Sequence, residues 1–152
     1  MFIVDSHCHL DGLDYEKNHR DLDDVLAKAA ARDVKFMLAI ATTLPGFHTL
    51  KALVGERENI ALSVGVHPLN QEEPYDVEEF RRLAADPRVV ALGETGLDYY
   101  YQQETKAQQQ ASFREHIRTG IALNKPIIVH TRDARDDTLA ILREKQRSEE
   151  HT

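Results

Sequence analysis

The chain has 152 residues, of which 41% are hydrophobic and 30% are charged, and its formal net charge is -7. This composition is typical of a globular domain and excludes a disordered linker, a fibre and a generic basic surface for nucleic acid. The sequence shows no apolar run of about 18 residues, which a membrane span needs, and no signal peptide at its start. The single cysteine, Cys8, excludes an intramolecular disulfide, so we expect a soluble, cytoplasmic protein without a membrane partner.

Short apolar segments recur at intervals of about 30 residues, the size of one strand-helix unit. They predict strands at residues 2–8, 35–41, 60–66, 89–93 and 126–130. The segments are continuously apolar instead of alternating, which favours strands that are buried on both faces of a parallel sheet.

The segments between the strands carry helical patterns. Apolar residues at spacings of three and four predict helices around residues 22–30, 77–84, 113–121 and 139–142. Asp21 is placed to cap the first of these helices, and Asp76 with Glu79 forms a variant of the capping box. Pro45 fits the first turn of a further helix, where its missing N–H is not needed.

The last nine residues, 144–152, contain no apolar side chain. Such a segment cannot extend a packed helix, and termini without buried contacts fray. We therefore expect one domain over residues 1–143, followed by a polar, frayed tail.

The first residues with metal-binding chemistry end the first predicted strand. Residues two apart in a strand share a face, so His7 and His9 project together, with Asp5 on the same side. Two imidazoles at this spacing suit one metal ion, but the motif alone also fits a hydrogen-bonded structural pair. Their place at the carboxyl end of a buried strand is where parallel barrels carry their chemistry.

Two further polar residues end later strands. A carboxylate such as Glu94, beside a buried strand, must be paired, coordinated or solvated, and an ion pair with Arg132 is its structural alternative. A lone histidine such as His130 is often a hydrogen-bonded core residue. In a parallel barrel, however, all three strand ends converge on one mouth, which favours a shared metal site.

Four segments resemble the motifs of the TatD family of metal-dependent deoxyribonucleases, in the amidohydrolase-like barrel superfamily. They are VDSHCHLD (4–11), GVHP (65–68), GETGLDY (93–99) and VHTRDA (129–134), in this order. The resemblance covers nearly the whole chain and implies an α/β fold, a TIM-type (β/α)8 barrel, here truncated to about five βα units.

The resemblance also implies two divalent metal ions, Mg²⁺, Mn²⁺ or Zn²⁺. His7 and His9 would hold one ion and His130 the other, with Glu94 as the catalytic carboxylate that bridges both. The implied activity is cleavage of phosphodiesters, with DNA or a related compound as the substrate.

Two residues are expected to contact that substrate. His67 follows the third strand and is assigned no metal, while the guanidinium of Arg132 suits a phosphate group. For Arg132, a salt bridge with Asp133 or another surface acid is an equally good structural alternative.

The chain also departs from the family pattern. Members continue for roughly another hundred residues, with a further histidine ligand after strand six and a metal-binding aspartate after strand eight. Neither falls within the 152 residues, and His151 lies in the polar tail. Two alternatives to a DNase therefore stay open: a catalytically dead fragment that binds metal weakly or self-associates, and a hydrolase of a small amide or lactone.

Five strands leave two open edges. In a closed barrel the first strand pairs with the eighth, so the first and fifth strands here expose backbone groups and apolar faces. We expect the chain to be unstable or to self-associate through these edges. Sedimentation analysis that finds a monomer with cooperative unfolding would contradict this expectation.

Overall fold

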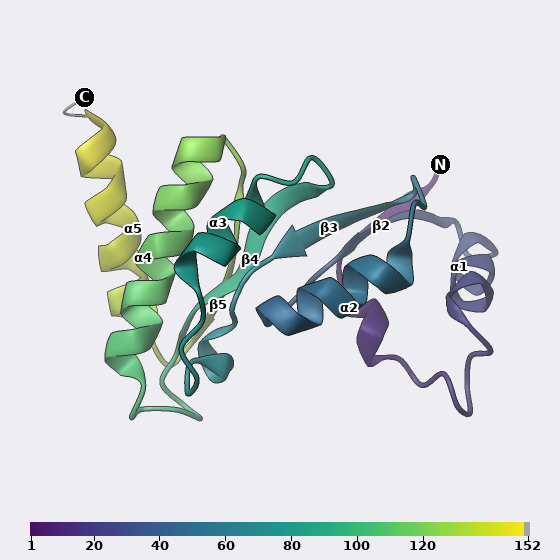
Figure 1. The fold of residues 1–152 in the computed structure, drawn as a ribbon, viewed down its shortest axis with the longest axis horizontal. Helices are drawn as coiled ribbons and strands as arrows, with labels where there is room; N and C mark the ends of the chain where they lie inside the picture. Colours follow the sequence, from purple (N-terminus) through teal and green to yellow (C-terminus); the bar gives the residue numbers. More distant parts are fainter. Residues whose placement is uncertain (151–152) are drawn as a thin grey trace.

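The computed structural model describes residues 1–150, with the backbone alone for residues 145–150. Its centre is a parallel sheet in which the strands follow one another in sequence order (Figure 1). The strands are β1 (Ile3–Cys8), β2 (Val34–Ala39), β3 (Ile60–Val64), β4 (Val89–Asp98) and β5 (Ile127–Arg132). All five predicted strands are confirmed, and every neighbouring pair is parallel.

Helices alternate with the strands. They are α1 (Leu22–Ala30), α2 (Leu44–Val54), α3 (Val77–Ala84), α4 (Lys106–Leu123) and α5 (Arg135–Glu150). The predicted starts are confirmed: Asp21 accepts a hydrogen bond from the backbone of Asp24, Asp76 accepts one from Glu79, and Pro45 lies in the first turn of α2. Among the described residues no helix is both long and apolar enough to span a bilayer.

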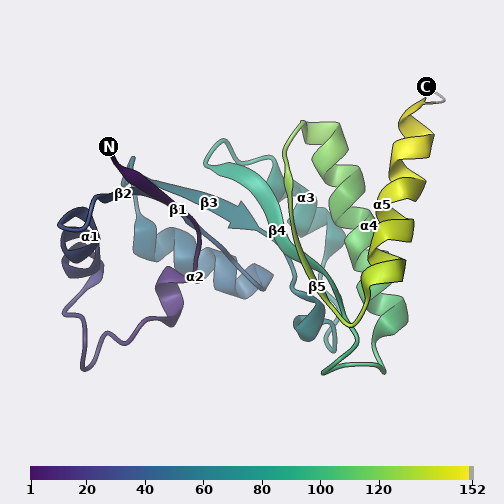
Figure 2. The ribbon, with the colours of Figure 1, turned by 180° about the vertical axis from the view of Figure 1, so that it is seen from behind.

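The helices and the sheet form layers. Helices α2, α3 and α4 lie on one side of the sheet, and the view from behind shows the strands in front of them (Figures 1 and 2). The main core between them contains the fully buried side chains of Phe47, Leu62 and Phe80. A second cluster beneath α4 and α5 includes Leu97 and Phe113. Burial of these apolar side chains holds the helices against the strands.

Strand β1 differs from the expectation of burial on both faces. The side chains of β3 and most of β4 are buried, whereas Ile3 and Val4 of β1 are 50% and 49% exposed. β1 is an edge strand that pairs only with β2. The prediction is therefore correct for β3 and most of β4 and wrong for β1, β5 and much of β2, because apolar composition alone does not show whether a second layer covers a strand.

Strand β4 continues to Asp98, beyond its predicted end at residue 93. Its later part pairs with β5, with Gly96 opposite His130 and Asp98 opposite Arg132. Gly96 has φ = 134°, and a Cβ atom there would overlap the carbonyl oxygen of His130. Glycine thus lets β5 approach closely and places the polar ends of the two strands side by side.

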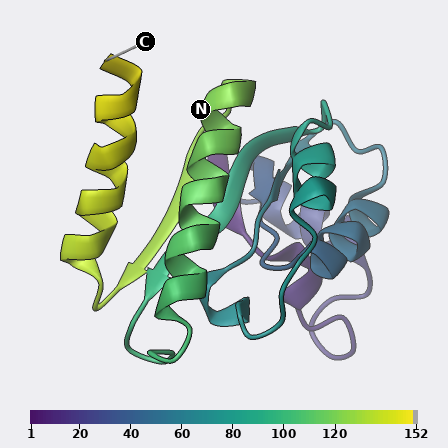
Figure 3. The same cartoon turned by 60° about the vertical axis from the view of Figure 1, so that its left-hand side comes forward.

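Helix α5 lies beside α4 at the β5 end of the sheet (Figure 3). The two helices are joined by an ion pair between Arg114 and Glu144, with 3.2 Å between Nη2 and Oε2. The backbone of α5 is helical to Glu150, past the predicted domain end at residue 143. In the tail that is predicted to fray, residues 144–152, the backbone is therefore helical as far as Glu150, and residues 151–152 lie outside the described part of the structure.

Candidate metal centre

The predicted ligands lie together at the carboxyl ends of the strands. Backbone hydrogen bonds tie these ends to one another: the N–H of His67 donates to the carbonyl of Thr42 at 2.8 Å, and that of Glu94 to Ala41 at 3.1 Å. His7 and His130 then converge on Glu94 from β1 and β5. Residues 123 positions apart in the chain therefore meet because parallel strands end at the same edge.

Glu94 faces these two histidines with different oxygen atoms. The Nε2 atom of His7 lies 3.4 Å from Oε2, and the Nδ1 atom of His130 lies 3.4 Å from Oε1. Each oxygen is thus directed toward a separate imidazole. This arrangement suits a carboxylate shared between two cations.

The first group of donors consists of His7, His9 and Glu94, whose ligand atoms all lie within 4.8 Å of one another. The Nδ1 atom of His9 lies 3.0 Å from the carbonyl oxygen of Ile40. A carbonyl only accepts, so Nδ1 carries the proton and Nε2 keeps its lone pair for a metal. Asp5 accepts a hydrogen bond from the backbone N–H of His7 at 3.1 Å and so supports the end of β1.

His130 is oriented by a residue that the sequence analysis missed, Asp98. The Oδ2 atom of Asp98 lies 2.9 Å from Nε2 of His130. An ionised carboxylate only accepts, so Nε2 carries the proton and Nδ1 presents its lone pair toward Glu94. Proteins orient metal-binding imidazoles with such carboxylates.

Asp98 is itself buried and strongly hydrogen-bonded. Burial favours its neutral form, but hydrogen bonds from the backbone N–H groups of Tyr101 and Tyr100 and from His130 outweigh it and hold the pKa of Asp98 below its usual value. Its position four residues after Glu94 was the available signal, because residues an even number apart in a strand share a face. The predicted end of β4 at residue 93 hid this signal.

His67 is the third imidazole near Glu94, with 3.9 Å between its Nε2 and Oε2. The ligand atoms of His67, Glu94 and His130 all lie within 4.8 Å of one another, which is close enough for one ion. However, its Nδ1 accepts a hydrogen bond from the N–H of Leu69 at 3.1 Å, so in the neutral ring Nε2 carries the proton. Burial lowers the pKa of His67 to about 4 despite the nearby Glu94, which keeps the ring neutral. His67 therefore presents a donor to the site.

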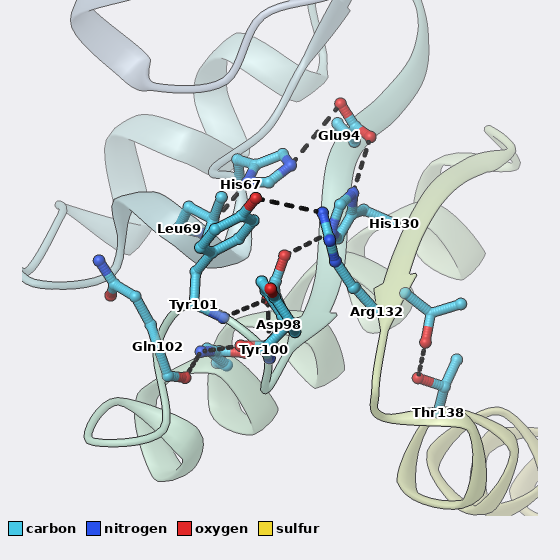
Figure 4. Close-up of polar contacts among 12 residues, drawn as sticks. His67, Leu69, Glu94, Asp98, Tyr100, Tyr101, Gln102, His130, Arg132 and Thr138 are labelled. Carbon is cyan, nitrogen blue, oxygen red and sulfur yellow. Dashed lines mark hydrogen bonds and ion pairs between the residues drawn. The ribbon is translucent and has the colours of Figure 1, made fainter.

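Arg132 points into the same region from the end of β5 (Figure 4). Its guanidinium lies over the rings of Tyr100 and Tyr101, 4.2 Å and 4.7 Å from their centroids. Within the described residues it forms no ion pair, so the proposed pairs with Glu94 and with Asp133 are both wrong.

The geometry fits divalent cations. Donor atoms about 2.1 Å from one tetrahedral ion lie about 3.4 Å apart, which matches the separations of His7 and His130 from Glu94. Imidazole and carboxylate together suit Zn²⁺ or Mn²⁺, and the carboxylate also suits Mg²⁺. Glu94 with His7 and His9 would hold one ion, and Glu94 with His130 the other.

A fifth histidine, His116, lies fully buried behind the end of β3. Its Nε2 accepts a hydrogen bond from the N–H of Val66 at 3.1 Å, and its Nδ1 lies 2.7 Å from the carbonyl oxygen of Ser112. Both ring nitrogens are thus satisfied in the neutral form. Burial lowers the pKa of His116 to about 4. The ring supports the backbone immediately before His67 and is placed away from the ligands.

This histidine should make folding stability depend on pH. Its pKa is lower in the folded chain than the ordinary value of 6.5, so the unfolded chain binds more protons between these values. The free energy of unfolding should therefore fall as the pH drops below about 6.5, by about 2 kcal/mol at about pH 5 relative to pH 7. Urea titrations at both pH values should show this fall in the free energy of unfolding. In a His116→Gln variant the fall should be smaller by the contribution of His116. An unchanged pH dependence in the variant would contradict the assignment.

Comparison with known sequences identifies related proteins. A family model described as TatD related DNase matches residues 4–151. The metal-dependent hydrolase YcfH of Escherichia coli K12, described as uncharacterized, is 73% identical over 96% of this chain and 55% of the relative. The protein of Klebsiella pneumoniae named 3'-5' ssDNA/RNA exonuclease TatD is 35% identical over 82% of this chain and 48% of its own length. The chain thus spans about half the length of the curated relatives it matches.

The fold is also found in solved structures. The crystal structure of YjjV, a TatD homologue from Escherichia coli K12, matches with a TM-score of 0.82 and 26% identity, over 93% of this chain and 55% of that one. A TatD-family hydrolase from Entamoeba histolytica matches with a TM-score of 0.79. These matches confirm the TIM-type α/β architecture, of which the described residues form five βα units.

Proposed function

The chain belongs to the TatD-related DNase family of metal-dependent hydrolases, and from this premise we propose that it cleaves phosphodiester bonds of DNA. In this proposal, two divalent ions share the carboxylate of Glu94. The observation that carries it is the pair of 3.4 Å separations that join each oxygen of Glu94 to a different histidine.

Bound divalent ions would supply an activated water and neutralise charge on the phosphoryl group. The chain's own residues would position them. His7 and His9 are directed to one side of Glu94, and Asp98 holds His130 on the other side with its Nδ1 lone pair toward the same carboxylate. Preorganised ligands of this kind reduce the cost of binding.

Two further residues are proposed to bind the substrate. His67 would donate from Nε2 to a phosphoryl oxygen, because its Nδ1 is already engaged by Leu69. The guanidinium of Arg132, with no acidic partner among the described residues, would bind a second oxygen of the phosphate. Both groups complement the negative charge of a phosphodiester.

The relative from Klebsiella pneumoniae is named a 3'-5' exonuclease of single-stranded DNA and RNA. We extend this substrate class to the present chain as part of the proposal.

The test is hydrolysis of single-stranded oligodeoxynucleotides labelled at the 3′ or the 5′ end, with the purified chain and Mg²⁺, Mn²⁺ or Zn²⁺. We expect stepwise shortening that requires metal, stops with a chelator and starts at the 3′ end. Metal analysis by mass spectrometry should find two ions per chain. Turnover of a small amide or lactone without cleavage of DNA would contradict the proposal, as would metal binding without any turnover.

A further inference from the structure

Two exposed tyrosines stand beside the candidate metal centre. Tyr100 and Tyr101 lie two and three positions after Asp98, just past the carboxyl end of β4, and are 55% and 60% exposed. Their rings are nearly perpendicular, at 87°, with 4.7 Å between the centroids. Aromatic side chains this exposed, next to polar groups that converge on one point, are typical of a binding surface.

The turn that carries the tyrosines is held rigidly. The Oδ1 atom of Asp98 accepts hydrogen bonds from the backbone N–H groups of Tyr100 and Tyr101 at 3.0 Å and 3.1 Å. The fully buried amide of Gln109 accepts from the N–H of Asp98 at 2.8 Å and donates to the carbonyl of Gln102 at 2.9 Å. A rigid turn loses little conformational freedom when a ligand binds, so its exposed rings are already placed for contact.

Arg132 completes the surface. It lies over one face of each tyrosine ring, and its Nη1 donates to the hydroxyl of Tyr101 at 3.4 Å. The guanidinium is thereby kept at the site by aromatic contacts and keeps its full charge for an anion. Planar aromatic faces next to a fixed cation match a nucleotide, which combines a flat base with a phosphate.

We propose that Tyr100, Tyr101 and Arg132 form a nucleoside-binding subsite, in which a base of a single-stranded nucleic acid stacks on a tyrosine ring and the adjacent phosphate contacts Arg132. This inference rests on the proposed function, because the phosphate is the one presented to Glu94. An unpaired base can turn out to stack on a protein ring, whereas in a duplex only the outer face of a terminal base pair is free, so the subsite favours single strands over duplex.

The same residue, Asp98, links this subsite to the metal centre. One of its oxygens holds the tyrosine turn, and the other holds His130. The stacked base and the metal ligands are therefore positioned by one buried carboxylate. When the terminal base of a strand is stacked at this subsite, the phosphate to be cleaved lies at a fixed distance from His130.

The experiment measures binding of a labelled, short single-stranded oligodeoxyadenylate by fluorescence anisotropy, in chelator so that no hydrolysis occurs. A second oligonucleotide differs only in having an abasic residue at its 3′ end. We expect the abasic oligonucleotide to bind about tenfold more weakly, the size of one lost stacking contact. Quenching of tyrosine fluorescence should accompany binding of the adenylate, and the signal is simple because the chain contains no tryptophan.

Variants identify the surface. Tyr100→Leu and Tyr101→Leu should each reduce the preference for the terminal base, whereas Tyr100→Phe should retain it because the ring remains. Phe2→Leu is the matched control, since Phe2 is also 60% exposed but lies before β1, at the amino end of the sheet. Circular dichroism of every variant checks that the fold is intact.

Each outcome distinguishes the subsite from the proposed function. Equal binding of the two oligonucleotides, or leucine variants that keep the base preference, would overturn the subsite even if DNA is hydrolysed. A base preference that depends on the tyrosines, together with no metal-dependent hydrolysis, would support the subsite and contradict the proposed nuclease activity.

Discussion

Replacing Glu94 with glutamine is expected to abolish metal-dependent hydrolysis. The amide keeps the size of the side chain but removes the negative charge and one of the two acceptor oxygens that face His7 and His130. Substitution of a residue that only supports a ligand typically lowers metal affinity by about 10- to 100-fold. Loss of a ligand shared by two ions should exceed this range, as isothermal titration with Mn²⁺ can measure.

The matched control is Glu79→Gln. Glu79 also contacts a histidine, with 2.9 Å to Nε2 of His48, but this pair lies between α3 and α2, outside the ligand cluster. The control should bind Mn²⁺ with unchanged affinity. If Glu94→Gln bound metal as tightly as the parent chain, the role of Glu94 as a bridging ligand would be wrong.

The second large effect is expected for Asp98→Asn. The side-chain oxygen of asparagine can still accept from the N–H groups of Tyr100 and Tyr101, which keeps the turn. Its amide nitrogen then faces Nε2 of His130 as a donor and favours the tautomer with the proton on Nδ1. That tautomer has no lone pair toward Glu94, so we expect metal affinity and turnover to fall by about 10- to 100-fold.

The tautomer itself can be observed. Nitrogen chemical shifts of His130 in NMR spectra distinguish a proton on Nε2 from one on Nδ1. In the Asp98→Asn variant we expect the proton to lie on Nδ1 instead of Nε2. Asp137→Asn is the control. Asp137 accepts a hydrogen bond of 2.8 Å from the hydroxyl of Tyr99, and this pair is separate from the metal ligands. Lower affinity with an unmoved proton would show that Asp98 does not act through the tautomer of His130.

Much of the fold could be predicted because its signals are local. Each strand is a short apolar run, and the helix starts at Asp21 and Asp76 have side-chain caps that depend on a few neighbouring residues. The exposure of β1 and the extension of β4 to Asp98 could not be predicted in the same way. They depend on which strands lie side by side and on how closely β5 approaches Gly96.

The candidate site shows the same division. His7, His9, Glu94 and His130 were recognisable because each ends or follows a short apolar segment of the sequence, which is the pattern of a strand. Asp98 and the ring contacts of Arg132 were not, because each depends on a contact with a residue distant in sequence. The proton on His67 was not either, because it depends on the turn that directs the N–H of Leu69 at the ring.

The sequence by itself determined the order of the elements, the family and the chemical types of the ligands, since these follow from residue identity and from short periodic patterns. Only the tertiary structure decided which atom of each ligand faces Glu94 and which residue orients it. The reason is physical: an imidazole can donate, accept or coordinate and a carboxylate can accept or coordinate, and the neighbours that folding brings within about 3 Å decide which of these each group does.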